Sequence, residues 1–454
     1  MKTRILPFFL ASLFLAGCVG APIEAPYGTY YVSANGSDRN DGFSEETPFK
    51  SLFKALVVSS QTNTKTITLL GTLDLSSEQS SSAERVFIIQ GTGRDLITIR
   101  GRSFNGKKAV LSGRDADRRV ILVKGVSSVC FEDVEISGGS SAGEGGGIGI
   151  GGGAQVILGR GAVITGNRSA TVGGGIAVAP GGKLYLRGGS VSGNVSSGVG
   201  GGIAIVGAGT ELVMESGEVR ENRAEGGGGV AVYEGGVFTL KGGVISGNEA
   251  VVAGGGLVLN RGAALTMEGG GITGNTSGGS GGGLALIERC IFTLKDGELG
   301  DNKSAEYGGA VAADNTSALA LLGGNMRKNS AGRYGGAVFS SGDFFKGPGS
   351  LCVIYGNDAP LQDANSAQMG GAVFISREGY GDMVRNRSAG GDALLDSALA
   401  GSAGGWEEDA RLPADGGIWE EERAEAPADG GQSELTDIPP DQDVPQEAGD
   451  AVSQ

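Results

Sequence analysis

Short apolar stretches alternate with glycine clusters through the middle of the chain. The segment 230–256, VAVYEGGVFTLKGGVISGNEAVVAGGG, holds three of them, at Val230–Val232, Phe238–Leu240 and Val244–Ile245. Each stretch has the composition of a β-strand, and none reaches the ten or so residues that a helix needs. Because glycine clusters separate the stretches, we expect three short strands joined by tight corners.

Two markers repeat with one period in this region. Glycine triplets, later Gly-Gly-Ala, end at residues 147, 175, 202, 229, 256, 283, 310, 337 and 372, so every step except the last is 27 or 28 residues. An asparagine, usually preceded by glycine, recurs in steps of 26 to 28 residues. Two markers that share a period over about 200 residues indicate a solenoid. The asparagines are Asn167, Asn194, Asn222, Asn248, Asn275, Asn302, Asn329 and Asn357.

We expect these asparagines to stack at one corner of the coil. An amide side chain there can bond the backbone and the same amide of the next turn. Four of the eight also stand in glycosylation sequons, which is the alternative interpretation and leaves the period unexplained. The strands of adjacent turns would then lie about 4.8 Å apart, in a parallel β-helix.

A second column supports this stacking. The residues seven positions before the asparagines alternate in sign over five consecutive turns. Opposite charges on neighbouring turns attract weakly and disfavour slips of register. The alternating residues are Arg187, Glu215, Lys241, Glu268 and Lys295.

The segment before the repeats predicts an N-terminal cap. Tyr30–Val32 has strand composition, and a turn-rich loop follows it. Residues 48–56 form an amphipathic helix with Phe49, Leu52, Phe53 and Leu56 on one face, which would cover the open apolar end of the solenoid. The expected divisions are a signal peptide at 1–17, tether and cap at 18–64, irregular turns at 65–147, 27-residue repeats at 148–372, a C-terminal cap at 373–400 and an acidic tail at 401–454.

The first 18 residues predict the location of the protein. Lys2 and Arg4 precede an apolar stretch that is too short to span a bilayer, and the segment ends Leu-Ala-Gly-Cys18. It resembles a bacterial lipoprotein signal, which implies that Cys18 is lipidated and becomes the mature N-terminus. We expect an exported chain, tethered to the outer membrane by this lipid and exposed at the cell surface. The periplasmic face of that membrane is the alternative.

Composition and charge exclude several classes. The 89 glycines among 454 residues lack the strict period of collagen, and the absence of histidine excludes every mechanism that uses one. Residues 401–454 carry 15 acidic residues against Arg411 and Arg423, so much of the net charge of −15 belongs to the tail. We expect this tail to be disordered and expect no nucleic-acid partner, since no basic patch is present.

The opening YYVSANGSD…PFKSL resembles the start of right-handed, single-stranded parallel β-helix proteins of the pectate-lyase-like class. Gly308-Gly309-Ala310-Val311 and its equivalents in the next two turns are similar to the repeats of polymorphic outer-membrane proteins. Together with the repeats, this resemblance implies an all-β fold, a right-handed parallel β-helix of roughly a dozen turns. Such repeats encode architecture and do not fix an activity.

The chemistry of the residues favours binding over catalysis. We assign no catalytic residue and no cofactor. Asp38 and Asp41 resemble part of a calcium loop but lack its bidentate glutamate, so they are a weak metal candidate beside the interpretation of an Asx-rich turn. Tyr307 and Tyr334 fall at one position of successive turns, next to an enlarged turn that contains Asp358 and Gln362. These four residues are candidates for holding a sugar ring or a protein side chain, whereas the alternative is that the tyrosines shield a corner.

Three functions follow in order of preference. The first is a non-enzymatic cell-surface lipoprotein, a rod for adhesion to a host or matrix protein or glycan. The second is a carbohydrate-active enzyme, either a polysaccharide lyase or a glycoside hydrolase, and the third is a structural spacer. A hydrolase would need two or three carboxylates facing each other across roughly 5–9 Å.

The spacing of the cysteines predicts free thiols. Cys290 and Cys352 are 62 residues apart, about two turns, which corresponds to roughly 9–10 Å along the axis. A disulfide tolerates a Cα separation of only about 7 Å. Cys130 lies several turns away. We expect these cysteines to be buried as small apolar side chains.

Overall fold

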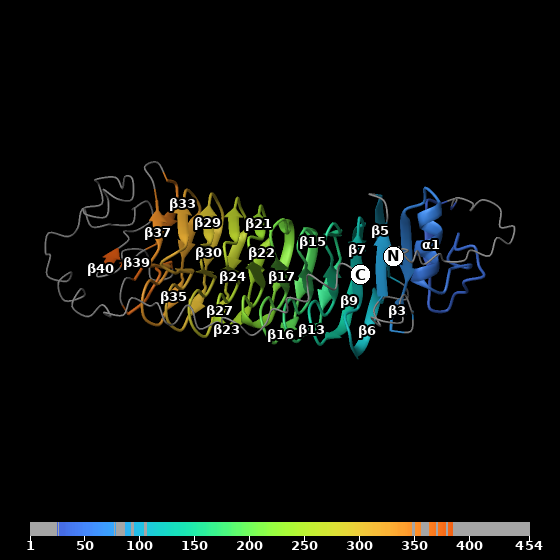
Figure 1. The fold of residues 1–454 in the computed structure, drawn as a ribbon, viewed down its shortest axis with the longest axis horizontal. Coiled ribbons are helices and arrows are strands. Elements are labelled where there is room, and N and C mark those ends of the chain that lie inside the picture. The colour runs from blue at the N-terminus through green and yellow to red at the C-terminus, as the bar shows by residue number, and fades with distance from the viewer. Residues whose placement is uncertain are drawn as a thin grey trace, which may run out of the picture.

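The computed structural model describes residues 25–384, apart from residues 26, 77, 79–86, 92–94, 104–106, 347–349, 356–362, 369–370 and 378–379. These residues form an elongated rod of short strands stacked turn on turn, with one helix, α1 (Leu52–Gln61), at the N-terminal end (Figure 1). The predicted all-β parallel β-helix is confirmed. The signal peptide, Cys18 and the acidic tail lie outside the described residues.

Two sheets run the length of the rod, one of 12 strands and one of 28. The first eleven strands of the smaller sheet are parallel, one to a turn, and only its last strand is antiparallel. The smaller sheet comprises β4 (Phe87–Gly91), β7 (Ile121–Gly125), β10 (Ile148–Ile150), β14 (Ile176–Val178), β17 (Ile203–Val206), β20 (Val230–Tyr233), β24 (Leu257–Asn260), β28 (Leu284–Ile287), β32 (Val311–Ala313), β36 (Val338–Ser340), β39 (Val373–Arg377) and β40 (Tyr380–Val384).

The larger sheet contains three stacks that follow one another around each turn. The first stack holds β1 (Thr29–Val32), β2 (Thr66–Leu70), β5 (Leu96–Arg102), β8 (Ser128–Glu132), β11 (Gln155–Leu158), β15 (Lys183–Ser192), β18 (Glu211–Arg220), β21 (Val237–Leu240), β25 (Ala264–Met267), β29 (Ile291–Leu294), β33 (Ala318–Leu321) and β37 (Asp343–Phe345). The second, which the long strands β15 and β18 also join, holds β3 (Thr72–Asp74), β6 (Ala109–Asp117), β9 (Val134–Ser141), β12 (Val163–Thr165), β22 (Val244–Ser246), β26 (Gly271–Thr273), β30 (Glu298–Gly300), β34 (Asn325–Arg327) and β38 (Val353–Ile354). The third holds β13 (Arg168–Ser169), β16 (Val195–Ser196), β19 (Arg223–Gly226), β23 (Glu249–Ala253), β27 (Thr276–Ser277), β31 (Lys303–Ser304) and β35 (Ser330–Ala331).

A repeat therefore contains four strands, and the expectation of three is wrong. The fourth is the short strand that follows each asparagine, as few as two residues in β13, β16 and β27. Such a strand is too short to show an alternating pattern in the sequence. It forms because the register of the longer strands places its backbone beside the same backbone of the next turn.

A continuous apolar core fills the rod. Each strand points alternate side chains inward, so that Val230 and Val232 of β20 are fully buried in this core. The residue between them, Ala231, faces the other way and packs in a second, smaller apolar layer with Val258 of β24 and Tyr233. This second layer explains why the middle position of these strands is often alanine.

The glycine triplets allow the chain to turn sharply between the third stack and the smaller sheet. At Gly228 an added Cβ would lie 2.4 Å from the carbonyl oxygen of Glu249 in the next turn, which no larger residue can tolerate. Gly227 beside it has φ +59°, a conformation that L-residues adopt at a cost. The period of the triplets is therefore set by a close approach of backbones, once in every turn.

The asparagines form a continuous buried ladder. The backbone N–H and the side-chain N–H of each one donate to the Oδ1 atom of the asparagine in the next turn, at 2.9–3.1 Å for Asn222, Asn248 and Asn275. The seven asparagines from Asn167 to Asn329 follow this pattern. The eighth position belongs to Asn365, so the assignment of Asn357 to the ladder is wrong.

The enlarged turn explains that correction. Asn365 follows Asn329 by 36 residues, and the chain returns to the ladder only after the segment that begins beyond Tyr355. Asn357 carries the same preceding glycine as the other members but lies outside the described residues. The extra residues therefore sit before the ladder asparagine, and the Gly-Asn marker alone does not locate it.

The cap helix begins later than predicted. Ser51 accepts a hydrogen bond from the Lys54 N–H as its N-cap, so Phe49 precedes the helix and bridges to Val32. Leu52 and Ala55 are buried against the core, whereas Phe53 is 48 % exposed. The prediction that Phe53 shares the buried face is wrong, because the buried face of the helix consists of Leu52, Ala55 and Ser59.

Two carboxylates hold the start of this helix. Glu78 accepts hydrogen bonds from the Leu52 and Phe53 N–H groups at 3.0 and 3.1 Å, which satisfies donors that have no partner within the helix. Burial raises the pKa of Glu78 above its ordinary value, more than these hydrogen bonds lower it. Asp38 accepts from the Lys50 and Ser51 N–H groups just before the helix.

The column of alternating charges pairs at two of its steps. Arg187 bonds Glu215 in the next turn, and Lys295 pairs with Glu268 at 3.2 Å. A second ladder is formed by Arg261, which lies 3.6 Å from both Glu234 and Glu288 in the turns on either side. Several acidic side chains on the rod are thus paired with basic side chains of neighbouring turns.

The three cysteines within the described residues form no disulfide and are buried, as predicted. Cys290 and Cys352 belong to the central core. Burial raises the pKa of the Cys290 thiol to about 11. Burial, with Glu132 adding to it, raises the pKa of Cys130 to about 11 as well.

Candidate functional site

Asp38 and Asp41 serve the architecture of the N-terminal cap. One oxygen of Asp38 accepts two backbone N–H groups, and the other accepts the Ser51 hydroxyl at 2.8 Å. Asp41 accepts the Phe43 N–H and the Thr47 hydroxyl, and these hydrogen bonds lower its pKa. The arrangement is that of an Asx-rich turn leading into a capped helix. Among the described residues, no group of three or more metal-binding side chains is found.

Tyr307 and Tyr334 stack on each other and on two phenylalanines. Their ring centroids are 5.6 Å apart with an interplanar angle of 6°, and each ring also meets a phenylalanine at 4.8 Å, Tyr307 with Phe339 and Tyr334 with Phe374. Tyr307 is only 5 % exposed, and its hydroxyl accepts a hydrogen bond from Arg333. Tyr307 therefore packs within the protein, in a small apolar cluster with Phe339 and Phe374.

Tyr334 is half-buried at the edge of this cluster, and a role of Tyr334 in binding stays a prediction. Asp358 and Gln362, the other two candidates of that turn, lie outside the described residues.

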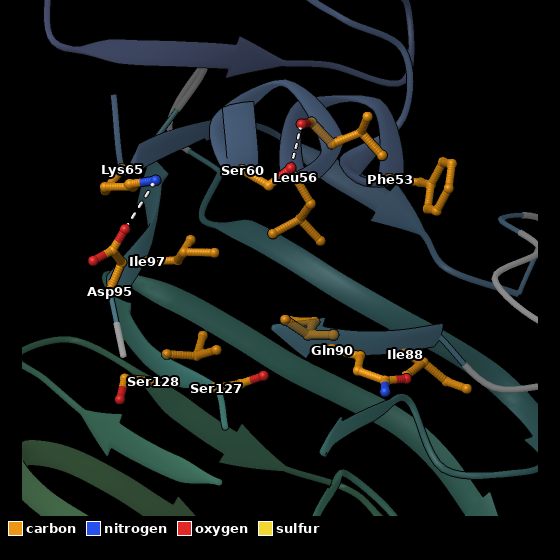
Figure 2. Close-up of a pocket in the computed structure, with 13 residues that line it drawn as sticks. Phe53, Leu56, Ser60, Lys65, Ile88, Gln90, Asp95, Ile97, Ser127 and Ser128 are labelled. Atoms are coloured by element: carbon orange, nitrogen blue, oxygen red, sulfur yellow. Dashed lines mark hydrogen bonds and ion pairs between the residues drawn. The ribbon is translucent and has the colours of Figure 1, made fainter. Parts of the chain in front are cut away.

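A cleft that the sequence did not indicate lies at the N-terminal end of the rod. It encloses about 400 Å³ between α1 and the first turns of the β-helix, a volume within the range of small-molecule sites. Phe53, Leu56 and Val57 form the helical wall. Figure 2 shows Leu56 projecting from the helix into the space above Gln90 and Ile88 of β4.

The cleft is apolar at one end and polar at the other. Phe53 lies at the apolar end, and Lys65 and Asp95 lie at the opposite end (Figure 2). Lys65 Nζ donates to the Ser59 carbonyl at 3.0 Å and lies 3.3 Å from Asp95 Oδ2. Ser127 and Ser128 of the following turn complete the floor near this polar end.

The folding of the cap creates this geometry. The helix buries Leu52 and Ala55, and this orientation turns Leu56, Val57 and Ser60 toward the outer side of the first strands. The polar end is built at Lys65, which lies between the end of the helix at Gln61 and the start of β2 (Thr66–Leu70), next to β5 (Leu96–Arg102). The lining residues come from three irregular turns, where no period guides a sequence-based search.

The comparisons with known proteins bear on the fold. A family model described as a right-handed β-helix region matches residues 88–277, and with the stacked parallel strands it supports the right-handed β-helix predicted above. No curated protein matches the sequence. Among solved structures, the chain is similar to GH136 lacto-N-biosidase from Eubacterium ramulus (native protein), at 13 % identity and a TM-score of 0.30, over 77 % of this chain and 64 % of that chain.

The chain thus spans less than two thirds of that enzyme. A likeness at this TM-score carries no argument about activity. No helix in the described part of the chain is long and apolar enough to cross a membrane.

Proposed function

We propose that this chain is an exported, lipid-anchored surface protein whose β-helix acts as a non-enzymatic rod and binds a host or matrix protein or glycan along its side. Export and anchoring rest on the signal-like segment that ends at Cys18. Binding along the side rests on the surface of the regular turns, where the repeats present the same positions again and again.

The observation that carries the proposal is an uncharged strip bordered by matched charges. Val237, Ala264, Ile291 and Ala318 lie side by side on the outward face of β21, β25, β29 and β33. Val237 is 44 % exposed and Ile291 is 52 % exposed, so both large apolar side chains lie in contact with solvent and not in a core. Ala264 and Ala318 between and beside them are partly buried, so the four side chains form a contiguous apolar row at the surface. Contiguous apolar surface is typical of a contact site.

Ion pairs between neighbouring turns lie on both borders of the strip. Arg261 with Glu234 and Glu288 precedes the strands, and Lys295 with Glu268 follows them. A catalytic carboxylate must be available to a substrate, and a hydrolase needs two of them facing each other across roughly 5–9 Å. Carboxylates that pair with cations of the neighbouring turn stabilise the register instead, so these borders support a binding surface over a catalytic one.

Saturable binding of the full-length chain to immobilised matrix proteins and glycans tests the proposal. Ile291→Glu places a charge in the centre of the strip and should weaken binding at least about tenfold, since a buried unpaired charge is costly at an interface. Val251→Glu is the matched control, because Val251 is also exposed, at 56 %, but lies in the third stack of the larger sheet. Equal binding by both variants would reject the strip, and no saturable binding by the wild type would favour a spacer.

A further inference from the structure

We propose that the cleft beneath α1 is a binding site for a small amphipathic carboxylate, with an apolar chain lying between the helix and β4 and its carboxylate at Lys65. The proposal is independent of the lateral strip, because the cleft lies at the N-terminal end of the rod and shares no residue with β21, β25, β29 or β33.

The apolar end of the cleft offers room for a hydrocarbon chain. Phe53, Leu56 and Val57 of the helix and Ile88 of β4 line this end, and Leu56 projects toward Ile88 (Figure 2). Phe53 is a large apolar side chain that the fold leaves half-exposed at this rim, although the rest of the cap is well packed. An apolar ligand would remove these surfaces from water, which is favourable in proportion to the area covered.

The polar end offers a cation that is only partly engaged. An ammonium group has three N–H bonds, and Lys65 uses two of them in its contacts with the Ser59 carbonyl and Asp95. The Lys65 side chain is mostly buried, whereas Asp95, its partner, is 73 % exposed. A ligand carboxylate can therefore bond the remaining N–H, and it can exchange with an Asp95 side chain that loses little on moving into water.

The two ends together select the class of ligand. A purely apolar molecule would leave the Lys65 ammonium without a further partner, and a cationic amphiphile would repel it. A sugar would place hydroxyl groups against the apolar side chains of Leu56, Val57 and Ile88, which neither donate nor accept hydrogen bonds. An alkyl carboxylate fits both ends, because its hydrocarbon chain can lie against the apolar walls while its carboxylate contacts Lys65.

Isothermal titration of the full-length chain with decanoate tests the site, with decanol and decyltrimethylammonium as matched ligands. We expect saturable decanoate binding that is stronger than the binding of either comparison ligand. Lys65→Met should weaken decanoate binding about tenfold and leave decanol binding unchanged. Asp95→Asn should strengthen decanoate binding about threefold, because the competing carboxylate is removed.

Two variants close the cleft from opposite walls. Val57→Trp fills it from the helix, and Gln90→Trp fills it from an exposed position of β4 that has little effect on folding. Each should reduce decanoate binding at least tenfold, whereas Val251→Trp on the far part of the rod should not. A thermal unfolding midpoint near that of the wild type shows that a variant has folded.

The absence of saturable decanoate binding by the wild type overturns the site. Binding that persists in Gln90→Trp places decanoate elsewhere and overturns it as well. Binding that is lost in Gln90→Trp but unchanged in Lys65→Met and in Asp95→Asn overturns the role of the cation and with it the carboxylate class. None of these outcomes depends on the lateral strip, so failure here and failure of the rod proposal can be told apart.

Discussion

Asn329 donates both its backbone N–H and its side-chain N–H to the Oδ1 atom of Asn365, at 2.8 and 2.9 Å. The two residues are 36 positions apart, yet the contact repeats the geometry that joins Asn302 to Asn329 across 27 positions. Continuity of the ladder is therefore kept across the enlarged turn. Asn365 is fully buried, and its own amide donates to the carbonyls of Met326 and Tyr355.

The first prediction compares two asparagines of that turn. Asn365→Ala should destabilise the protein by about 2–4 kcal/mol, because it removes the acceptor of the buried Asn329 backbone N–H and one acceptor of the Asn329 side-chain amide. Asn357→Ala should change the free energy of unfolding by less than about 0.5 kcal/mol, since it removes no ladder contact. Denaturant unfolding of the two variants measures both. The reverse order of the two effects would show that Asn357 belongs to the ladder.

The second prediction ranks the two kinds of ladder. Asn248→Ala in the middle of the amide ladder should cost about 3 kcal/mol or more, because four buried hydrogen bonds of its side chain are lost. Arg261→Ala in the charge ladder should cost less than about 1 kcal/mol, since both of its partners are partly exposed.

The salt dependence of the two destabilising effects distinguishes the charge ladder from the amide ladder. Unfolding measured in about 1 M salt should reduce the effect of Arg261→Ala and leave that of Asn248→Ala unchanged, because screening acts on exposed charges. Similar costs for the two variants would mean that surface charge contributes more to the register than the buried amides do.

The third prediction concerns the thiols and alkaline pH. Cys130, Cys290 and Cys352 should resist alkylation at pH 8 in the native protein and react fully in denaturant, with no Cys290–Cys352 peptide in mass spectra. A linked peptide would contradict the assignment of turns. The raised pKa values of Cys290 and Cys130, about 11 against 9.0, mean that the unfolded chain releases protons first as the pH rises.

Stability should therefore be fully present below pH 9 and fall between about pH 9 and 11, by at most about 1.4 kcal/mol per pH unit for each thiol. Burial also raises the pKa of Tyr233 to about 12, which extends the loss to higher pH. Cys290→Ala should give a shallower pH dependence of unfolding than the wild type. An unchanged slope in this variant would argue against a buried neutral thiol at Cys290.

The fourth prediction tests the anchor. Labelled palmitate should enter the wild-type chain in a bacterial host and should not enter Cys18→Ser, because the basic and apolar segment before Leu-Ala-Gly-Cys18 is similar to a lipoprotein signal. Equal labelling of the two chains would leave a secreted protein without a lipid.

The sequence predicts the architecture wherever the same residue type recurs at one position of every turn. Gly228 and Asn248 recur because a close backbone approach and a buried amide are needed in every turn, so period alone predicts the solenoid. Asn365 could not be located in this way, since an insertion before it breaks the count. The two-residue strands such as β13 show no pattern of their own, because their pairing is imposed by the neighbouring turns.

The cleft was beyond prediction for a similar reason. In a helix that begins at Pro48, Phe53 would lie on the buried face. Ser51 caps the helix instead, so the helix begins at Leu52, and Phe53 lies at the rim of the cleft. Lys65 and Asp95 are brought together by the pairing of β2 with β5, whose register no repeat specifies. Tyr307 likewise acquires its partner Phe339 from the following turn.

The most direct test of the rod as a non-enzymatic binding protein is a cleavage assay on the purified full-length chain. Pectate, alginate, hyaluronan and neutral glycans are incubated with the protein, with and without Ca²⁺, and new reducing ends and unsaturated products are measured. Because Glu234, Glu268 and Glu288 beside the strip are paired with cations of neighbouring turns, we expect no cleavage of any of these substrates. Turnover that disappears when an aspartate or glutamate of the rod is replaced would contradict this and establish a carbohydrate-active enzyme.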